Sequence, residues 1–214
     1  MFEFTFIMLL AVAVSIDSLS FGIIYGMRNI KIPVFSQTVI ALFSGTVFFI
    51  AMVMGSVLRS FLSESFAETL GSIIFFVIAC SYLLKANLKY CHKDTIATFS
   101  IKSLGIIIKI LKEPESADMN VSGEIDLKES VFLGMALAID AVAAGLGAAA
   151  SGFTIILTSF LIAVFEFLFL YFGHLLGKKS NKKLDEKKAD FFAGVIFMLI
   201  SIIKTISIYR KYNI

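Results

Sequence analysis

The chain has 214 residues, of which 58% are hydrophobic and 16% are charged. Ordinary soluble domains carry roughly 45–50% apolar and about 25% charged residues, so this composition excludes a soluble globular protein. The formal net charge is +3, and the basic residues stand in short segments between apolar stretches. They therefore indicate membrane topology signals and exclude a nucleic-acid-binding surface.

Five apolar stretches are long enough to cross a lipid bilayer as helices, which takes about 20 residues each. They cover residues 5–27, 34–58, 66–84, 130–150 and 153–176. A sixth stretch, residues 190–209, contains Lys204, whose alkyl stem can lie along lipid while its ammonium reaches the interface. The sequence predicts an all-α polytopic membrane protein with six transmembrane helices. No cleaved signal peptide is expected, because the first residues carry Glu3 and no basic residue.

Lysine and arginine are concentrated in alternate connections. The first connection holds Arg28 and Lys31, the third (residues 85–128) holds seven lysines, and the fifth (residues 178–188) holds six. The second connection holds Arg59 beside acidic residues, and the fourth holds no charge. Because basic loops stay in the cytoplasm, we expect the first, third and fifth connections to be cytoplasmic and both termini to lie outside.

The two halves of the chain are related by an internal repeat. The segment AVSIDSLSFG (residues 13–22) aligns with ALAIDAVAAG (residues 136–145) at a separation of 123 residues. The matching positions are Asp17 with Asp140, Gly71 with Gly194 and, at a separation of 118, Gly55 with Gly173. Because each half has an odd number of helices, the sequence predicts two inverted three-helix repeats, as in secondary transporters. These are residues 1–92 and 130–214, joined by a cytoplasmic connection over 93–129.

Asp17 and Asp140 each stand near the middle of a predicted membrane helix. A carboxylate there costs about 2.5–3.5 kcal/mol, so it is kept where it faces protein or a water-filled cavity. Small residues share their helix faces, including Ala13 and Ser20 beside Asp17, and would let the two carboxylates approach at the membrane midplane. A close pair needs a cation or a shared proton.

Carboxylate, hydroxyl and backbone oxygens are hard ligands, suited to Mn²⁺, Mg²⁺ or Ca²⁺ rather than to copper or zinc. The sequence therefore predicts a transported-cation site that contains Asp17, Asp140 and Ser20. The alternative is that each aspartate hydrogen-bonds a neighbouring helix and only holds the two halves together.

Glu166 is a third acid inside the membrane, and the Gly55–Gly173 alignment gives it the apolar counterpart Phe48. Either Glu166 adds a ligand or carries a coupling proton at the cation site, or it pairs with Lys204 as a buried ion pair. His174 is expected to lie at the cytoplasmic interface rather than to bind a metal. Two cysteines, Cys80 and Cys91, lack metal-ligand spacing and are expected to be structural.

A twelve-residue segment in the third connection, residues 118–129, matches the EF-hand calcium loop. Gly123 stands at the sixth position, where the loop turns sharply. The expected oxygen ligands for Ca²⁺ or Mn²⁺ come from Asp118, Asn120, Ser122, Glu124, Asp126 and Glu129. The alternative is a solvated acidic turn that keeps the loop shape without an ion. An incoming helix could occupy residues 101–112, with Pro114 ending it.

Glu129 leads directly into the helix that carries Asp140, about 16 Å further along a continuous helix. Ion binding in the loop would therefore bias the tilt of that helix.

The chain resembles the sporulation membrane protein YtaF group, which is related to the MntP-type manganese efflux pumps. The similarity rests on three segments near the N-terminus, residues 13–18, 25–28 and 32–33. It also rests on residues 114–129 and on LGMALAID at residues 133–140. The resemblance implies six helices and Mn²⁺ export through the membrane aspartates. Unlike the manganese pumps, which carry a glutamate and a proline in their second helix, residues 34–58 hold neither.

The leading hypothesis is a secondary transporter that exports a divalent cation through the lipid bilayer. One alternative is a non-transporting, sporulation-associated membrane protein with a calcium-responsive loop, and another is an amino-acid exporter. An enzyme is not expected: two membrane aspartates could form a protease dyad, but neither lies in a Gly-x-Gly-Asp or Tyr-Asp setting.

Overall fold

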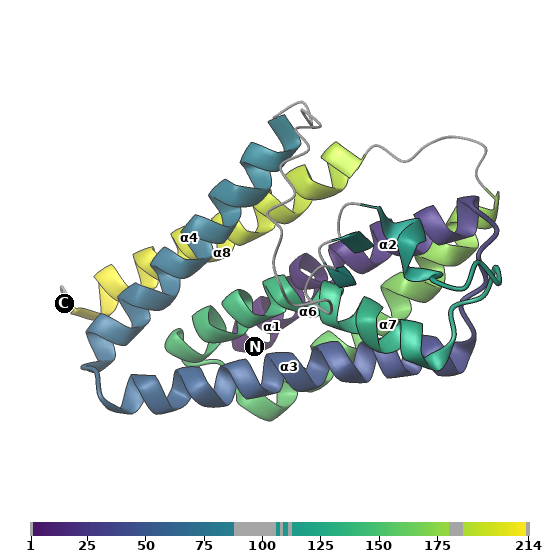
Figure 1. Ribbon diagram of the computed structural model, residues 1–214. Coiled ribbons are helices and arrows are strands. Elements are labelled where there is room, and N and C mark those ends of the chain that lie inside the picture. The colour runs from purple at the N-terminus through teal and green to yellow at the C-terminus, as the bar shows by residue number, and fades with distance from the viewer. Residues whose placement is uncertain (1, 88–105, 108, 111–112, 180–185, 213–214) are drawn as a thin grey trace.

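The computed structural model describes the chain except residues 1, 88–105, 108, 111–112, 180–185 and 213–214. The described part is helical, and its β-structure is one isolated bridge between Lys31 and Glu124. The elements drawn in Figure 1 are α1 (Phe2–Val14), α2 (Ile16–Met27), α3 (Val34–Ser60), α4 (Glu64–Asn87), η1 (Pro114–Ala117), α6 (Leu127–Ala150), α7 (Ile155–Lys179) and α8 (Glu186–Tyr212). The predicted all-α class is confirmed.

Several helices are long and apolar enough to cross a membrane. Within the described residues these spans are Phe4–Met27, Val34–Ser60, Ser65–Leu84 and Ile155–Lys179, with a fifth if the bent pair Leu127–Ile139 and Ala141–Ala150 forms one span. They coincide with the first five predicted stretches, so the chain is a multi-pass membrane protein. The sixth predicted stretch falls in α8, which is 27 residues long, and its role as a span stays a prediction.

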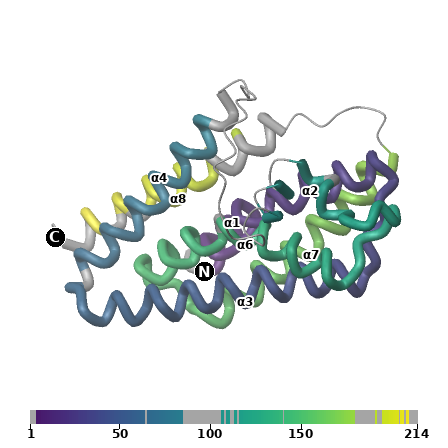
Figure 2. Tube along the Cα trace, in the orientation of Figure 1, coloured from purple at the N-terminus to yellow at the C-terminus, as the bar shows by residue number. Residues whose placement is uncertain are grey.

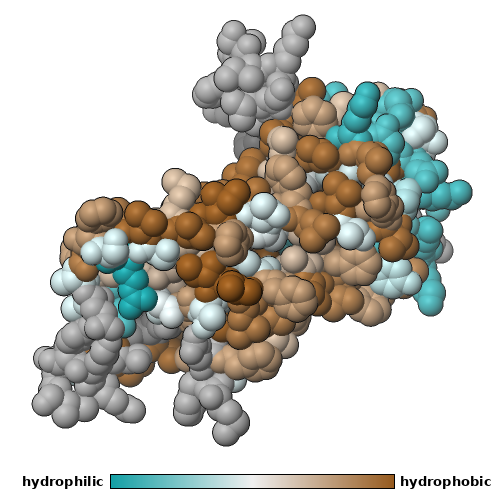
Figure 3. All heavy atoms as spheres, turned by 90° about the horizontal axis from the view of Figure 1, so that it is seen from below, coloured by the Kyte–Doolittle hydropathy of each residue, from teal (hydrophilic) through white to brown (hydrophobic). Residues whose placement is uncertain are grey.

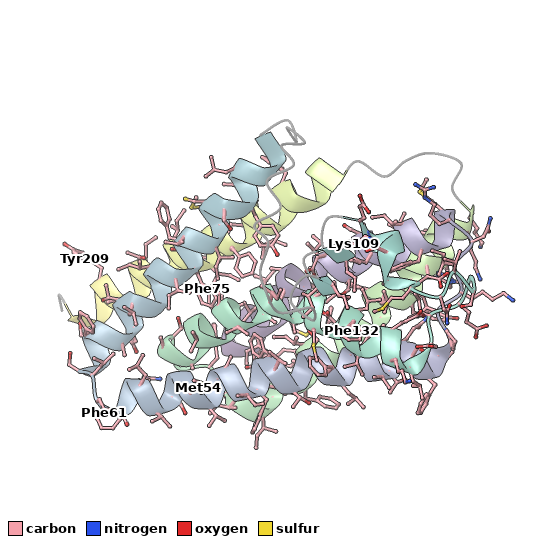
Figure 4. All side chains as sticks on the ribbon, in the orientation of Figure 1. Met54, Phe61, Phe75, Lys109, Phe132 and Tyr209 are labelled. Carbon is pink, nitrogen blue, oxygen red and sulfur yellow. The ribbon has the colours of Figure 1, made fainter. Side chains whose placement is uncertain are left out.

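The outer surface of the helices is apolar, as a lipid-facing surface must be. Met54 on α3, Phe61 at the end of α3 and Tyr209 on α8 are largely exposed and lie on the outside of the bundle (Figure 4). Brown, hydrophobic residues cover most of the face drawn in Figure 3, and hydrophilic residues gather at one end.

That hydrophilic end contains parts of the first, third and fifth connections. The backbone N–H of Lys31 donates to the Gly123 carbonyl oxygen at 2.8 Å, which joins the first connection to the third. The backbone nitrogen of Lys178 lies beside Gly26, so the C-terminal end of α7 is at this end too. At the opposite end, Gly152 lies against the Arg59 guanidinium. The described parts of the first and third connections and the start of the fifth therefore share one end, as the charge pattern predicts.

The helices pack as defined pairs. The most extensive contacts join α3 to α6, α2 to α7 and α4 to α8, followed by α3 with α7. In Figures 1 and 2 the α4–α8 pair leans away from the remaining helices. A core around α1 contains the fully buried Ile7 and Leu10 and reaches Phe48, Phe75 and Phe197.

Glycines allow α2 and α7 to approach closely. Gly22 and Gly26 on α2 face Gly173 and Gly177 on α7, and both pairs have the four-residue spacing of close-packed membrane helices. A Cβ added at Gly22 would lie 2.5 Å from the Leu170 carbonyl oxygen. Because the neighbours are backbone atoms, the two helices are in direct backbone contact along this seam.

Candidate functional site

The helix that carries Asp17 is interrupted two residues before it. The predicted span over residues 5–27 is present as Phe4–Met27, but its helix has a one-residue break that was not predicted, because α1 ends at Val14 and α2 begins at Ile16. Ser15 between them has φ −89° and ψ 4°, a conformation that opens the turn, although its N–H still donates to the Ala11 carbonyl oxygen at 3.1 Å. The neighbouring sequence has no proline or glycine, and nothing local explains the break.

The helix that carries Asp140 is also distorted at its aspartate. The segments Leu127–Ile139 and Ala141–Ala150 of α6 meet at an angle of 47°. Asp140 is therefore the residue at the bend. Its side chain lies outside the described part of the chain, so the predicted approach of Asp140 to Asp17 stays a prediction.

The interruption gives Asp17 a helix N-terminus of its own. Asp17 lies in the first turn of α2, is partly buried, and accepts a hydrogen bond from the Ser18 N–H to its Oδ1 at 3.0 Å. The positive end of a helix dipole stabilises a carboxylate in this position. Discontinuous helices whose ends face the membrane interior are the usual setting of transporter ion sites.

Glu166 is 1% exposed and is joined to α2. The Ser18 hydroxyl donates to Glu166 Oε1 at 2.7 Å, across the glycine seam between α2 and α7. Ser18 itself is fully buried. The predicted ligand Ser20 is only partly buried, and its hydroxyl donates to the Ile16 carbonyl oxygen of its own helix at 3.4 Å. The side chain of Lys204, the other predicted partner of Glu166, lies outside the described residues.

Ser44 on α3 is a further buried polar residue near this level, and the sequence argument overlooked it. It is fully buried, and its hydroxyl has no hydrogen-bond partner within the described part of the chain. Its neighbour Gly45 lies against Ala163 on α7: a Cβ there would be 2.7 Å from the Ala163 Cβ. Ser159, four residues before Ala163 on α7, has its Oγ 3.9 Å from the Sδ of Met52 on α3.

These contacts between α3 and α7 place Ser44 and Glu166 at about the same height along the two antiparallel helices. Glu166 follows Ala163 by three residues on α7, and Ser44 precedes Gly45 by one on the antiparallel α3. The described site therefore consists of the Glu166 carboxyl group and the Ser18 hydroxyl that donates to it, beside the first turn that carries Asp17. The signal that could have revealed Ser44 was a serine inside an otherwise apolar membrane stretch.

The predicted calcium loop has the expected turn. Asp118 Oδ1 accepts the Ser122 N–H at 2.9 Å, and Asp118 Oδ2 accepts the Gly123 N–H at 2.8 Å. Asn120 Oδ1 also accepts the Ser122 N–H at 2.9 Å. Gly123 has φ +77°, the left-handed conformation that favours glycine. The sharp turn at the sixth position is confirmed.

Glu129, the last predicted ligand of the loop, caps α6. It is 3% exposed; its Oε1 accepts the Met119 N–H at 2.8 Å and its Oε2 accepts the Asp126 N–H at 3.0 Å. Asp126 Oδ1 in turn accepts the Glu129 N–H at 2.9 Å, which completes a capping box. Among the described residues no three His, Cys, Asp or Glu side chains form a metal-binding group, so Glu124 and the other loop ligands stay predictions.

The loop is packed onto the end of the bundle. The fully buried Ile125 joins a cluster with Ile110, Tyr25 and Leu133, and the Tyr25 hydroxyl donates to the Pro114 carbonyl oxygen at 2.6 Å. The predicted incoming helix over residues 101–112 lies largely outside the described residues. The loop therefore closes the hydrophilic end of the bundle rather than projecting from it.

His174 is buried within the protein, with 6% of its surface exposed, and its predicted level at the cytoplasmic interface stays a prediction. Its backbone packs on Gly22 and Gly26 along the seam, which draws that turn of α7 into the protein.

Cys80 is a free, partly buried thiol, as expected; Cys91 lies outside the described residues.

A sequence model of the family described as "Mntp: Putative manganese efflux pump" matches residues 1–83 and 92–204. The chain belongs to this MntP family. It is also similar to the "Probable sporulation protein YtaF" of Bacillus subtilis (strain 168), with 40% identity over 204 residues that cover 92% of this chain and 97% of that protein. No solved structure matches the chain.

The resemblance predicted from the sequence motifs is confirmed. The MntP family is a family of efflux pumps rather than of enzymes, which agrees with the membrane spans of the described helices.

Proposed function

We propose that this MntP-family protein exports a divalent metal cation, most specifically Mn²⁺, from the cytoplasm across the cell membrane. The observation that carries the proposal is the position of Asp17, in the first turn after an interrupted membrane helix. Asp140 at the bend of α6 supplies a second carboxylate in a corresponding place. Two hard carboxylate ligands suit a hard divalent cation.

We further propose that the two halves are inverted repeats related by a pseudo-twofold axis. Exchanging α1 and α2 with α6, α3 with α7, and α4 with α8 leaves the packing scheme unchanged. Under this exchange, the α3–α6 contact corresponds to the α7–α2 contact. The contact of α4 with α6 corresponds to the contacts of α8 with α1 and α2. This agreement supports a repeat of three helices in each half.

The glycine contacts support the same symmetry at the level of residues. A Cβ at Gly22 would meet Leu170, Gly173 and His174, whereas a Cβ at Gly145 would meet Phe48, Ala51 and Met52. Gly22 and Gly145 are 123 residues apart. Their neighbours pair at a separation of 122 residues: Phe48 with Leu170, Ala51 with Gly173 and Met52 with His174.

This register revises one part of the sequence alignment. Gly55 lies beside Leu146, and Gly177 lies beside Ile23. Ile23 and Leu146 are 123 residues apart, the separation of corresponding residues in the first helices of the two halves. Gly55 therefore corresponds to Gly177 rather than to Gly173, and Glu166 corresponds to Ser44 rather than to Phe48.

In the proposed cation site, Asp17 and Asp140 are the charged ligands. Carbonyl oxygens at the end of α1 are available because the helix is interrupted at Ser15. Ser20 supplies a hydroxyl, and Glu166 is a third ligand or the carrier of a coupling proton. The basic residues Arg28 and Lys31 favour a cytoplasmic position for the hydrophilic end, which would place both termini outside.

The test is Mn²⁺ uptake by everted membrane vesicles that contain the full-length protein. Asp17→Asn and Asp140→Asn should each abolish the uptake, because a neutral amide is a much weaker ligand for a divalent cation. Glu113→Gln, an exposed carboxyl group outside both predicted metal sites, is the matched control and should transport normally. Uptake that survives in both aspartate variants would refute the proposal, and competition by zwitterionic amino acids but not by metals would favour an amino-acid exporter.

A second candidate function is a membrane protein that responds to calcium without transport. It is favoured by the turn at Gly123 and by the capping of α6 through Glu129, since this helix carries Asp140. Calorimetry of the full-length protein with Ca²⁺ and with Mn²⁺ tests it. Binding that is lost in Asp118→Asn, together with unchanged metal content in intact cells, would support this candidate over the exporter.

A further inference from the structure

His174 on α7 and Gln37 on α3 are buried polar side chains that the proposed cation site does not use. They are 6% and 2% exposed, respectively. The Nδ1 atom of His174 and the Oε1 atom of Gln37 are both buried without a hydrogen-bond partner within the described part of the chain. A buried polar atom is costly to leave unsatisfied, so two such atoms on helices that pack together indicate a ligand that both can bind.

The two side chains lie at about the same height along the antiparallel helices α3 and α7. Ile40 on α3 and Leu170 on α7 belong to one buried cluster at the hydrophilic end of the bundle. Gln37 precedes Ile40 by three residues on α3. His174 follows Leu170 by four residues on α7, so each side chain lies about one helical turn nearer the hydrophilic end than this cluster.

Both side chains are held in place beside the loop. The Gln37 Nε2 group donates to the Ile32 carbonyl oxygen at 2.9 Å, which fixes the amide and leaves Oε1 available. The neighbouring Ser36 hydroxyl donates to the Ile125 carbonyl oxygen of the loop at 2.9 Å. The backbone of His174 packs on the glycine seam. The two available atoms are therefore carried by fixed parts of the bundle, where the loop closes it.

We propose that His174 Nδ1 and Gln37 Oε1 together form an entry site, which binds the divalent cation on its way from the cytoplasm to Asp17. This inference rests on the proposed export function and adds a second binding step to it. Glu166 and His174 both lie on the buried side of α7. They are eight residues apart, or about 12 Å along the helix, so the entry site lies about two turns nearer the hydrophilic end than Glu166.

The chemistry of the two ligands suits passage and selection. Both are neutral, and a site with fewer charged ligands binds a divalent cation more weakly than a pair of carboxylates does. The charge of Lys178, one turn beyond His174, is on an exposed side chain, where solvent and salt screen it. An imidazole nitrogen suits transition metals, whereas Mg²⁺ and Ca²⁺ prefer oxygen ligands. The entry site therefore favours Mn²⁺ over Mg²⁺, a distinction that carboxylates alone make poorly.

Pulsed electron paramagnetic resonance of Mn²⁺ added in excess to the purified full-length protein tests the entry site, because a coordinated imidazole nitrogen couples to the Mn²⁺ spin. The protein is purified without a histidine tag, so its imidazoles are those of His92 and His174. Nitrogen coupling should be present in the wild type and in the control His92→Gln, and it should be lost in His174→Gln. Gln37→Glu should keep the coupling and show it at a lower Mn²⁺ concentration, because a carboxylate replaces a neutral oxygen ligand.

A wild-type protein without nitrogen coupling overturns the entry site, and a direct hydrogen bond between His174 and Gln37 would then satisfy both atoms. Coupling that survives in His174→Gln, or that Gln37→Glu abolishes, overturns it as well. Mn²⁺ uptake by everted vesicles separates this result from the export proposal, since Mg²⁺ should compete more strongly in His174→Gln than in the wild type. Wild-type vesicles that take up no divalent cation would contradict the export function, whereas Mn²⁺ uptake with equal Mg²⁺ competition in both proteins would overturn the entry site alone.

Discussion

The contact between α2 and α7 holds Ser18 against Glu166, and Gly22→Ala perturbs it without changing a polar group. The added Cβ would lie 2.5 Å from the Leu170 carbonyl oxygen and 2.9 Å from the His174 nitrogen, where ordinary contacts are 3.4–4 Å. Both neighbours are backbone atoms, so no side chain can rotate away. The two helices must separate by about 1 Å along the seam.

The cost follows from two opposing effects. Overpacking of a well-packed interior costs about 1–3 kcal/mol, and the upper part of this range applies because the backbone cannot yield locally. Alanine in a helix gains about 0.5–1 kcal/mol over glycine. Gly22→Ala should therefore lower the free energy of unfolding by about 1–2 kcal/mol, or about 2–8 °C in melting temperature for a chain of this size.

Thermal unfolding of the purified protein in detergent measures this difference. Gly134→Ala is the matched control on α6, because its Cβ would lie 3.2 Å from the Phe43 Cβ, an overlap of only a few tenths of an ångström. The control should be neutral or slightly stabilising. If Gly22→Ala unfolds at the same temperature as Gly134→Ala, the α2–α7 contact is not as close as described and the argument for a rigid Ser18–Glu166 pair fails.

Three changes test how the loop closes the end of the bundle. Tyr25→Phe leaves the Pro114 carbonyl oxygen without its donor, which costs about 1–2 kcal/mol and should speed hydrogen exchange in residues 113–129. Glu129→Ala removes the acceptor of three backbone N–H groups, those of Met119, Asn120 and Asp126, so the Met119 amide should exchange faster and the cap should lose about 1 kcal/mol. Gly123→Ala meets no atom within 4 Å, so its cost of about 1 kcal/mol is purely conformational, and an unchanged exchange rate in the loop would refute it.

The membrane helices could be predicted because one physical requirement dominates them. A spanning helix must be apolar over about 20 residues, and the stretches over residues 34–58 and 153–176 agree with α3 and α7 to within a few residues. The turn at Gly123 was predictable for a similar reason, since only glycine adopts that backbone conformation freely. The capping box of Asp126 and Glu129 was also readable from their three-residue spacing.

The interruption at Ser15 and the partner of Glu166 were not predictable in this way. A serine in an apolar helix gives no signal of a break, and the break depends on packing with distant helices. The helical periodicity of the sequence grouped Ser20 with Asp17, whereas the contact to Glu166 comes from Ser18, which is 148 residues away along the chain. That contact requires the backbone approach of α2 and α7.

The register of the repeat depends on the same kind of information. Sequence identity paired Gly55 with Gly173, because both are glycines in corresponding helices. Under the proposed repeat, the packing would pair Gly55 with Gly177, because Gly55 lies beside Leu146 and Gly177 lies beside Ile23, the counterpart of Leu146. A shift of four residues is one helical turn and keeps the same face. Periodicity alone could not separate the two alignments.

The revised register gives the asymmetry of the site a physical reason. If both halves carried glutamate at the positions of Ser44 and Glu166, two carboxyl groups would lie at one level across the axis, and their repulsion would keep one of them protonated throughout the cycle. With serine at position 44, the proposed repeat carries a single carboxyl group at this pair of positions, and no such repulsion arises. Ser44→Glu should therefore bury a second carboxyl group and lower the melting temperature of the purified protein, and an unchanged melting temperature would contradict the buried position of Ser44.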